Sequence, residues 1–489
     1  MSAPLILGTN SIKDVGYNVD NSLRFNDGSS DYLQFTPSAT SNQKTWTVSC
    51  WVKRSKLSSA QFIWGVNGDT AGHYFTELLF SGADNLEFRQ GGTVGDPYQT
   101  QFVTNQVFRD VSAWYNIIVA ADTTQSTESD RLKIYVNGSQ ITSFSTDNYP
   151  SQNENFRWHF VSGSNYPHTI GRRGRSSSGY FGGYIAEWVD VDGSQLDATS
   201  FGEFDEDSGI WKPIDVSGLT FGTNGAYLDF EDSSALGNDV SGNNNDFTVN
   251  NLTSIDQTTD TCTNNYATLN SLTPNYGSGG KNYSNGNLTF TLDSTNWETT
   301  FSTFALTQGK WYCETKIEDL SSTTGFSHFG IGDINQKNFV DSDFLSDSKT
   351  CGIVFDYRTG QSDFRRNGSV HQDVAVDFAI GDIIGMAIDI DNSHLYFHKN
   401  GTYLTIDSNV GDPTSGSSGT GGLDFFTGGV DFAVGVGAYS NKSGLHLNFG
   451  NPPYSISSGN SDGNGYGNFE YSVPSGYYAL NTKNLAEYG

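Results

Sequence analysis

Short apolar stretches that end in turn-forming residues recur along almost the whole chain. Each spans about five to eight residues and is rich in Thr, Val, Ile, Tyr or Phe, which favour pleated strands. Gly, Asn, Asp and Ser separate the stretches, and Gly alone accounts for 56 of the 489 residues. The usual helix formers Ala, Leu, Glu and Lys are sparse. The pattern therefore predicts an all-β protein.

Asn-Gly dipeptides between strand-like stretches indicate two-residue hairpins, because the primed turns of such hairpins need positive φ at the central residues. The dipeptide occurs three times in this setting, at Asn137-Gly138, Asn367-Gly368 and Asn400-Gly401. The chain is also longer than one hydrophobic core normally requires. Because the hairpins lie in both halves, we expect two β-sandwich domains joined by an irregular connector.

Changes in composition divide the chain into five predicted segments. Clean core strands such as Ile383–Ile390 indicate the sandwiches, and Asn-, Ser-, Thr- and Gly-rich sequence indicates the connector. Leu480–Tyr488 fits one helical turn or a docking tail. The chain has no heptad repeat, so we expect no coiled coil. The segments are an N-terminal anchor (1–20), a first sandwich (21–200), a connector packed on the domains (201–287), a second sandwich (288–450) and a Gly/Tyr-rich tail (451–489).

The net charge of the chain argues against nucleic acid as a partner. The chain has 26 basic and 54 acidic residues, a net charge of −28. Such a chain repels phosphate backbones, so we expect no binding to nucleic acid. The acidity fits solubility and salt tolerance, or loops that hold Ca²⁺ through Asp and Asn oxygens. No regular loop such as D-x-D-x-D-G occurs, so the sequence predicts no cofactor and leaves Ca²⁺ open.

The cysteines and apolar runs give two further expectations. Cys50, Cys262, Cys313 and Cys351 show no C-x-x-C spacing, and three of them lie in apolar strand patterns as buried thiols do. No apolar run approaches the roughly 20 residues that cross a bilayer, so we expect no membrane insertion. The first eight residues lack the features of a secretory signal, which predicts synthesis in a cytosol and release by a route such as lysis.

The sequence offers no pair of carboxylates placed as a glycosidase needs them. The acidic run Glu203–Asp207 has flanks that read as turns, so we expect a solvated loop. Glu187 lies on the opposite strand face from Asp190 and Asp192, so these groups cannot act together. No G-x-S-x-G, H-E-x-x-H or phosphate-binding loop occurs. The sequence predicts that the protein is not an enzyme.

Two histidines share one predicted strand face. His394 and His398 are four residues apart, which separates them by roughly 13 Å along a strand and excludes a shared metal ion. We expect them on a solvent-facing strand edge.

Three arginines stand together in a Gly- and Ser-rich loop of this acidic chain. Arg172, Arg173 and Arg175 could bind carboxylates or phosphates in a bidentate manner. Tyr180 and Trp158 are aromatic residues near the loop that could stack on a sugar. We therefore predict these five residues as ligand-binding, with an acidic sugar or an acidic patch of a neighbouring subunit as the ligand. Two alternatives stay open, a solvated loop that offsets local charge and aromatic residues that only pack.

The two halves resemble two known families of curved, two-sheet sandwiches. The first half resembles laminin-G-like (concanavalin A-like) domains at Leu23–Phe25, Trp46–Val52, Trp114–Val119, Leu132–Gly138 and Phe181–Trp188. The second half resembles SPRY domains at Gly309–Glu314, Gly330–Gly332, Gly381–Gly385 and Leu395–Gly401. The resemblance implies concanavalin A-like, jelly-roll β-sandwiches that bind proteins or glycans through loops.

The combination resembles virion proteins of marine tailed bacteriophages, especially cyanophages. The matching phrases are Asp239–Thr248, Thr263–Asn270 and Val473–Leu480. The resemblance implies a non-enzymatic virion surface protein, such as a tail fibre, tail tip or capsid-surface knob, that mediates attachment to host-surface glycan or protein. It further implies assembly in the host cytoplasm, release by lysis, contacts with other virion proteins and a homo-oligomer, with a trimer favoured. The alternatives are a capsid-decorating structural protein without receptor binding and a glycan depolymerase.

Overall fold

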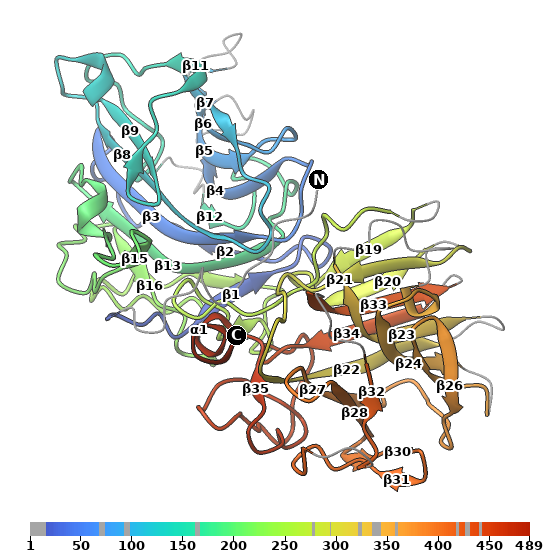
Figure 1. Cartoon of the computed structure of the whole chain (residues 1–489). Coiled ribbons are helices and arrows are strands. Elements are labelled where there is room, and N and C mark those ends of the chain that lie inside the picture. Colours follow the sequence, from blue (N-terminus) through green and yellow to red (C-terminus); the bar gives the residue numbers. More distant parts are fainter. Residues whose placement is uncertain are drawn as a thin grey trace. The chain divides into compact units, whose positions relative to one another are not determined.

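The computed structural model describes residues 16–67, 74–91, 98–161, 167–275, 279–293, 295–320, 325–334, 344–356, 360–416, 420–425, 431–439 and 443–489. The first fifteen residues of the predicted N-terminal anchor lie outside this set. The chain divides into an N-terminal unit, Val15–Thr263, and a C-terminal unit that begins at Asn264. Strands dominate both units, as Figure 1 shows, and the all-β prediction is confirmed.

The N-terminal unit is a sandwich of two antiparallel sheets. Sheet 1 has the order β10 (Ser139–Gln140), β9 (Leu132–Val136), β8 (Trp114–Asp122), β3 (Thr45–Arg54), β13 (Gly183–Asp192), β1 (Ser22–Phe25) and β18 (Gln257–Thr258), with β16 (Ala226–Leu228) also paired to β13. Sheet 2 has the order β11 (Phe144–Asn148), β7 (Thr100–Val107), β6 (Asn85–Gly91), β5 (Phe75–Phe80), β4 (Gln61–Asn67), β12 (His168–Ile170), β2 (Tyr32–Phe35) and β17 (Thr248–Asn250). Outside the two sheets lie the hairpin β14 (Gly202–Phe204) with β15 (Trp211–Pro213) and the 3₁₀ turns Glu128–Asp130 and Ala198–Ser200.

Alternate residues of these strands fill the core between the sheets. Trp46 of sheet 1 lies edge-on to Trp64 of sheet 2, with ring centroids 6.1 Å apart. Phe88 and Trp188 lie in the same fully buried cluster. Large aromatic residues on facing strands thus hold the two sheets together.

An irregular segment covers the outer face of sheet 1. Trp51, Trp114 and Tyr184 lie on that face, and Phe221 and Tyr227 pack with them in a separate buried cluster. Phe221 and Tyr227 both lie within residues 201–287, which the sequence predicts as a connector.

Residues 201–287, expected to form that connector, divide between the units at Thr263. Their first part contributes β16, β17 and β18 to the sheets of the N-terminal unit. Apolar side chains explain this, because Leu228 and Phe247 lie in the core of the sandwich.

The C-terminal unit is a second sandwich. Sheet 3 has the order β19 (Lys281–Ser284), β20 (Thr289–Leu292), β34 (Ser443–Asn448), β22 (Lys310–Leu320), β27 (Ile383–Asp389), β28 (His394–Lys399) and β29 (Thr402–Tyr403), with β32 (Leu423–Asp424) paired to β28 and β35 (Tyr478–Ala479) to β22. Sheet 4 has the order β21 (Glu298–Phe301), β33 (Phe432–Tyr439), β23 (Phe326–Asp333), β24 (Thr350–Asp356), β25 (Asp363–Arg366) and β26 (Ser369–Asp373). The remaining elements are the hairpin β30 (Thr405–Ile406) with β31 (Asn409–Val410), the 3₁₀ turn Phe344–Ser346 and the helix α1 (Thr482–Tyr488).

The C-terminal tail covers the outer face of sheet 3. Phe469, Tyr477 and Ala479 pack against Tyr312 and Tyr396 in one buried cluster. The helical turn predicted near the C-terminus is α1, and β35 docks the tail to β22 as a parallel strand. No helix in the described parts of the chain is long and apolar enough to cross a membrane.

The three predicted hairpins are confirmed. Both central residues of each turn have positive φ, as primed turns require. The φ values are 47° and 76° at Asn137-Gly138, 50° and 78° at Asn367-Gly368, and 49° and 81° at Asn400-Gly401. The four cysteines are free, and Cys50, Cys313 and Cys351 are buried as expected.

The prediction of solvent-facing histidines on β28 is wrong. His394 and His398 are both buried. The ring of Tyr471, from the tail, lies 5.2 Å from the His398 ring, and the His398 Nε2 lies 2.7 Å from the Tyr312 hydroxyl. The strand face is closed because the tail, more than 70 residues later in the sequence, packs over it.

Candidate ligand-binding face

The outer face of sheet 2 carries charged and aromatic side chains. Strand alternation directs Leu78 and Phe88 into the core, so their neighbours Glu77 and Arg89 point the other way. The register sets Arg89 directly opposite Glu77, and Phe62 of β4 lies on the same face. The sequence thus builds a polar patch on the surface opposite the core.

The predicted arginine loop lies directly over this patch. A Cβ on Gly65 would stand 3.0 Å from the Gly174 nitrogen, and a Cβ on Gly174 would stand 2.6 Å from the Val66 nitrogen. A Cβ on Gly179 would likewise meet the Phe62 ring at 2.5 Å. Only glycine therefore allows the loop to approach β4 so closely.

Three guanidinium groups surround one buried carboxylate. Glu77 is fully buried, and its two oxygens lie 3.1 Å from the Arg89 Nε and 3.4 Å from the Nε of both Arg173 and Arg175. Burial raises the pKa of Glu77 above its ordinary value, and Arg89 and Arg173 oppose the rise. Arg89 also lies 3.6 Å from Glu87. The ion pairs fasten the loop to the sheet.

Aromatic rings of the sheet pack against the guanidinium groups of the loop arginines. The guanidinium carbons of Arg172 and Arg175 each lie 4.0 Å from a ring centroid, of Tyr32 and Phe75 respectively. Within the described residues, Arg172 has no carboxylate within ion-pair distance. Tyr180 is half-buried, with its ring centroid 6.2 Å from that of Tyr32.

The structure thus brings four predicted residues onto one face and places the fifth in the core. We call Arg89, Arg172, Arg173, Arg175 and Glu77, together with the rings of Tyr32, Phe62, Phe75 and Tyr180, the arginine face.

Trp158 offers no ring face for stacking on a sugar. Its side chain is 1% exposed, and its ring centroid lies 4.6 Å from that of Trp64. Its indole nitrogen donates to the Asp190 carboxylate at 3.1 Å. Sequence proximity alone suggested its role; β-sandwich packing directs the ring inward.

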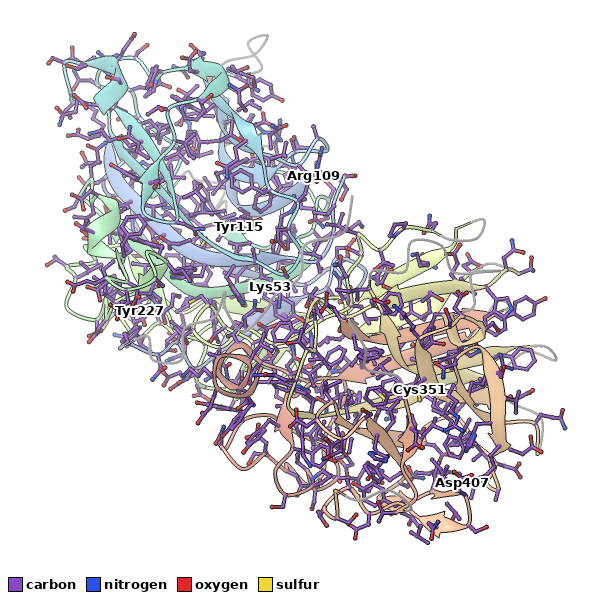
Figure 2. All side chains as sticks on the ribbon, in the orientation of Figure 1. Lys53, Arg109, Tyr115, Tyr227, Cys351 and Asp407 are labelled. Carbon is purple, nitrogen blue, oxygen red and sulfur yellow. The ribbon has the colours of Figure 1, made fainter. Side chains whose placement is uncertain are left out.

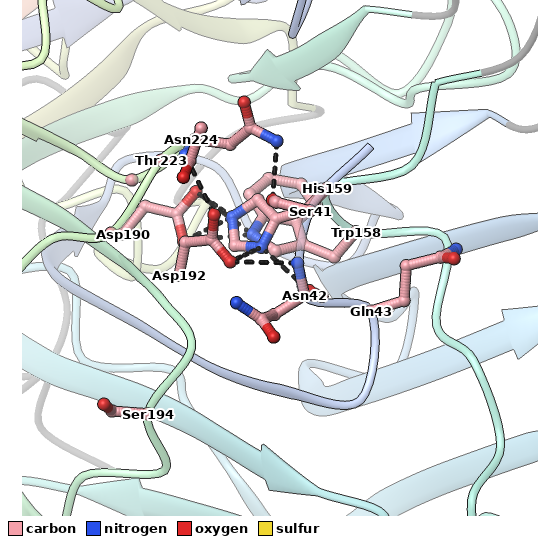
Figure 3. A network of polar contacts seen from close by, with 12 residues as sticks. Ser41, Asn42, Gln43, Trp158, His159, Asp190, Asp192, Ser194, Thr223 and Asn224 are labelled. Atoms are coloured by element: carbon pink, nitrogen blue, oxygen red, sulfur yellow. Dashed lines mark hydrogen bonds and ion pairs between the residues drawn. The ribbon is translucent and has the colours of Figure 1, made fainter. Parts of the chain in front are cut away.

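Trp158 belongs to a buried polar network, shown in Figure 3. The His159 Nε2 lies 2.9 Å from the Asp190 carboxylate, and the Nδ1 lies 3.5 Å from Asp192. Asp192 accepts a hydrogen bond from the Asn224 backbone at 2.9 Å. Burial disfavours the charged form of His159, but the carboxylates outweigh it and raise the pKa of His159. The network ties three separate segments of the unit together.

Glu187 occupies a second buried site, which local sequence patterns do not reveal. It lies at the point where the pairing of β13 with β3 shifts register, with φ at 48°. Its carboxylate accepts the Tyr227 hydroxyl at 2.9 Å and 3.0 Å, and the Tyr17 hydroxyl lies 3.2 Å from that of Tyr227. Burial raises the pKa of Glu187 to about 8, although the hydrogen bond from Tyr227 opposes the rise.

The acidic run near residue 203 is a small surface hairpin. Glu203 and Asp205 both lie 3.4 Å from the Lys212 Nζ, across β14 and β15. Hydrogen bonds from Ser208 lower the pKa of Asp205 to about 2, so this carboxyl is ionised at neutral pH.

The described part of the chain holds no group of three or more His, Cys, Asp or Glu side chains arranged to bind a metal ion. Two Asn- and Gly-rich loops instead use their acidic residues to bind backbone. The Asp239 carboxylate accepts N–H groups of Tyr227, Ser241 and Asn245, and Asp462 is held in a similar way. The absence of a cofactor stays a prediction, with Ca²⁺ as its open alternative.

A comparison with known protein families finds a match in the N-terminal unit. Residues 27–189 match the family model of the concanavalin A-like lectin/glucanases superfamily. No curated protein matches the chain.

Solved structures to which the chain is similar include a SPRY domain, a pair of laminin G domains and a carbohydrate-binding module. The SPRY domain of human HERC1 is 14% identical, with a TM-score of 0.25 over 33% of this chain and 87% of that one. Domains LG4-5 of the mouse laminin alpha1 chain are 10% identical, with a TM-score of 0.28 over 91% of each chain. The CBM40 of the Ruminococcus gnavus IT-sialidase, bound to α2,3-sialyllactose, is 17% identical, with a TM-score of 0.25 over 35% of this chain and 89% of that one. TM-scores this low carry no argument about function. The N-terminal unit has the concanavalin A-like, laminin G-type fold that its sequence predicts.

Proposed function

We propose that the protein is a non-enzymatic virion surface protein of a tailed bacteriophage, which attaches the particle to a glycan or protein on the host surface. Its place is a tail fibre, a tail tip or a capsid-surface knob, and its partners are other virion proteins and the host ligand. A homotrimer is the expected assembly. The phage-like phrases in the sequence support this proposal, and the lectin-type fold of the N-terminal unit is compatible with it.

The arginine face is the single observation that carries the attachment role. It combines four arginines (Arg89, Arg172, Arg173, Arg175) with Glu77, and Glu87 lies beside it, so these six residues carry a formal charge of +2 in a chain of −28. A positive patch on an acidic protein attracts a negatively charged ligand and gives no such attraction to a neutral one. The ligand class that fits best is an acidic glycan or an acidic protein loop.

Within this face, Arg172 is the arginine best placed to contact the ligand. Arg173 and Arg175 are already engaged by the buried Glu77, whereas Arg172 lies on the Tyr32 ring. Its guanidinium offers donors for a carboxylate or a sulfate, and Tyr32 and Tyr180 are aromatic surfaces beside it.

The test is binding of labelled, purified protein to whole cyanobacterial cells, at low and high salt and with or without EDTA. Wild type is expected to bind saturably, with an affinity that falls as salt rises. Arg172→Gln is expected to weaken binding roughly tenfold, the value of one charge-assisted hydrogen bond. Loss of binding with EDTA would place Ca²⁺ at the ligand site.

Lys133→Gln is the matched control. Lys133 is half-buried like Arg172, but it lies on sheet 1, where it pairs with Asp130. Equal losses for the two variants would contradict a role of the arginine face. Absence of binding by folded wild type would favour a capsid-decorating protein, and release of reducing sugar would favour a glycan depolymerase.

A further inference from the structure

A lysine and an aspartate form a fully buried pair on the outer face of sheet 1, away from the arginine face. Lys53, labelled in Figure 2, lies on β3, and Asp260 follows β18. Their side chains are 1% and 0% exposed, and the Lys53 Nζ lies 2.8 Å from the Asp260 Oδ2. The two residues are 207 positions apart in the chain.

Aromatic side chains enclose this pair. The sheet register sets Lys53 opposite Trp114 on β8 and opposite Tyr184 on β13, so both rings flank it on the same face. The Nζ lies 5.3 Å from the Tyr184 ring centroid. The Trp114 indole nitrogen donates to the Asp260 Oδ1 at 3.3 Å. Aromatic rings thus border the pair, and the Trp114 N–H is directed at the carboxyl group.

The charged state of this pair is costly. Burial lowers the pKa of Lys53, and Asp260 and the more distant Asp110 oppose that change. Arg24 also faces this region, because the pairing of β1 with β13 sets it directly opposite Tyr184. A neutral amine beside a neutral carboxylic acid avoids part of the desolvation cost, and an amide avoids it entirely.

We propose that Lys53 and Asp260 condense to an intramolecular amide cross-link. One proton passes from the Lys53 ammonium to the Asp260 Oδ2, which leaves an amine and a carboxylic acid. The Nζ attacks Cγ, while the Trp114 N–H stabilises the negative charge that develops on Oδ1. The bond between Cγ and Oδ2 then breaks, the nitrogen gives up a second proton, and Oδ2 leaves as water. No oxidant or co-reactant is consumed.

Proximity makes this step feasible without an enzyme. The fold holds the amine in hydrogen-bond contact with the carboxyl group, and such intramolecular pairs react as if at very high concentration. The bond joins β3 to the last residues of the N-terminal unit, so it encloses most of that unit in one covalent loop. A pull on the ends of the unit would then act across the cross-link instead of the enclosed strands.

A second pair in the same protein serves as an internal control. The Lys310 Nζ also lies 2.8 Å from a carboxylate, that of Asp389. However, Lys310 is 27% exposed, and Asp389 accepts two further hydrogen bonds from Asn392. Water solvates this ion pair and Asn392 stabilises the carboxylate, so we expect it to stay ionic.

Peptide mapping of the full-length purified protein by mass spectrometry tests the proposal. The expected result is one branched peptide that joins the segments around Lys53 and Asp260 and is lighter than their sum by one water. The peptides around Lys310 and Asp389 are expected to stay separate. Intact mass alone is insufficient, because Asn-Gly and Asp-Gly sites also lose small molecules.

Lys53→Arg and Asp260→Ala are expected to abolish the branched peptide and the corresponding loss of water. Arginine keeps the positive charge but has no amine to condense. Because the wild-type map is read directly, the test holds even if a variant fails to fold. Separate, unmodified Lys53 and Asp260 peptides from folded wild type would overturn the proposal, and so would a branched peptide that persists in Lys53→Arg.

Discussion

Each unit covers the outer face of one sheet with an irregular segment, but different interactions anchor the two covers. In the N-terminal unit, buried side-chain pairs serve this purpose: Lys53–Asp260 holds the segment after β18, and Glu187–Tyr227 holds β16 at the edge of the irregular segment to β13. In the C-terminal unit, the fully buried Glu314 accepts backbone N–H bonds from Glu470 and Tyr471 of the tail, at 3.0 Å and 2.8 Å.

The two units show two ways in which an irregular segment can cover the outer face of a sheet without forming a third layer of helices or strands. The Glu187–Tyr227 pair depends on the protonation of Glu187, so the N-terminal unit is expected to respond to pH. The tail is held by buried side chains such as Phe469 and Tyr477 and, in addition, by two backbone N–H groups that share one buried acceptor. That acceptor is Glu314, which no residue of the tail itself can replace.

Removing that acceptor is expected to have the largest effect. Glu314→Ala leaves the backbone N–H groups of Glu470 and Tyr471 without this acceptor. It also removes one of the hydrogen-bond partners of the Tyr312 hydroxyl and of the Asn448 amide, which keep His398 and Asn468 respectively. We expect the C-terminal unit to lose about 3–5 kcal/mol of unfolding free energy. Urea unfolding followed by tryptophan fluorescence measures this loss.

Glu318→Ala is the control for that variant. It lies on the same strand but is 39% exposed, so its removal leaves no buried donor unpaired. If both variants lowered the unfolding midpoint equally, Glu314 would not be the anchor of the tail.

The next largest effect is expected in the stability of the N-terminal unit, which depends on pH through Glu187. The pKa of Glu187 is about 8 in the folded chain and has an ordinary value of 4.5. Because the folded pKa is raised, stability is fully present below pH 4.5 and is lost as pH rises through 8. The full shift corresponds to about 5 kcal/mol, of which about 3–4 kcal/mol is lost between pH 5 and 8. We expect the wild-type N-terminal unit to lose stability between pH 5 and 8, in the range set by these pKa values.

Glu187→Gln isolates this response. Glutamine keeps an oxygen acceptor for Tyr227 and cannot ionise, so the variant is expected to be more stable than wild type at the alkaline end and similar at the acid end. Denaturant unfolding at a series of pH values compares the two proteins. Parallel pH curves would show that another group causes the response.

A smaller effect is expected where the arginine loop crosses sheet 2. Gly174→Ala places a Cβ 2.6 Å from the Val66 nitrogen, so backbone must move. We expect a loss of about 1–3 kcal/mol, the usual range for overpacking. Gly218→Ala, at a glycine with open space around it, is the control and is expected to leave thermal unfolding unchanged. A neutral Gly174→Ala would show that the loop does not pack as described.

The smallest effects separate ligand contact from support within the arginine face. Arg173→Gln removes one partner of the buried Glu77 and is expected to cost about 1 kcal/mol. Arg172→Gln is expected to change stability by less than about 0.5 kcal/mol, because it removes no ion pair within the described residues. Thermal unfolding of both variants measures the difference. A larger loss in Arg172→Gln would mean that this arginine supports the fold.

The sequence predicts those features that depend on neighbouring residues. The Asn137-Gly138 turn and the strands on either side follow from local φ preference and alternation. The arginine loop stands out from its composition, and the structure keeps Arg172, Arg173 and Arg175 on one face.

Contacts between distant segments explain what the sequence does not predict. Glu187 and Tyr227 are 40 residues apart, and Lys53 and Asp260 are 207 apart, so no short pattern connects them. His398 reads as solvent-facing from alternation alone, because the tail that covers it lies far along the chain. Trp158 is directed inward by packing against Trp64, which its neighbours in sequence do not indicate.

The central claim is that the arginine face binds an acidic group on the host surface. The most direct test is equilibrium binding to the acidic polysaccharide fraction of host cells, before and after its carboxyl groups are reduced and its sulfates removed. Wild type is expected to bind the untreated fraction saturably and to lose binding to the neutralised one, and Arg172→Gln is expected to bind both weakly. Equal binding of wild type to both fractions would contradict the claim.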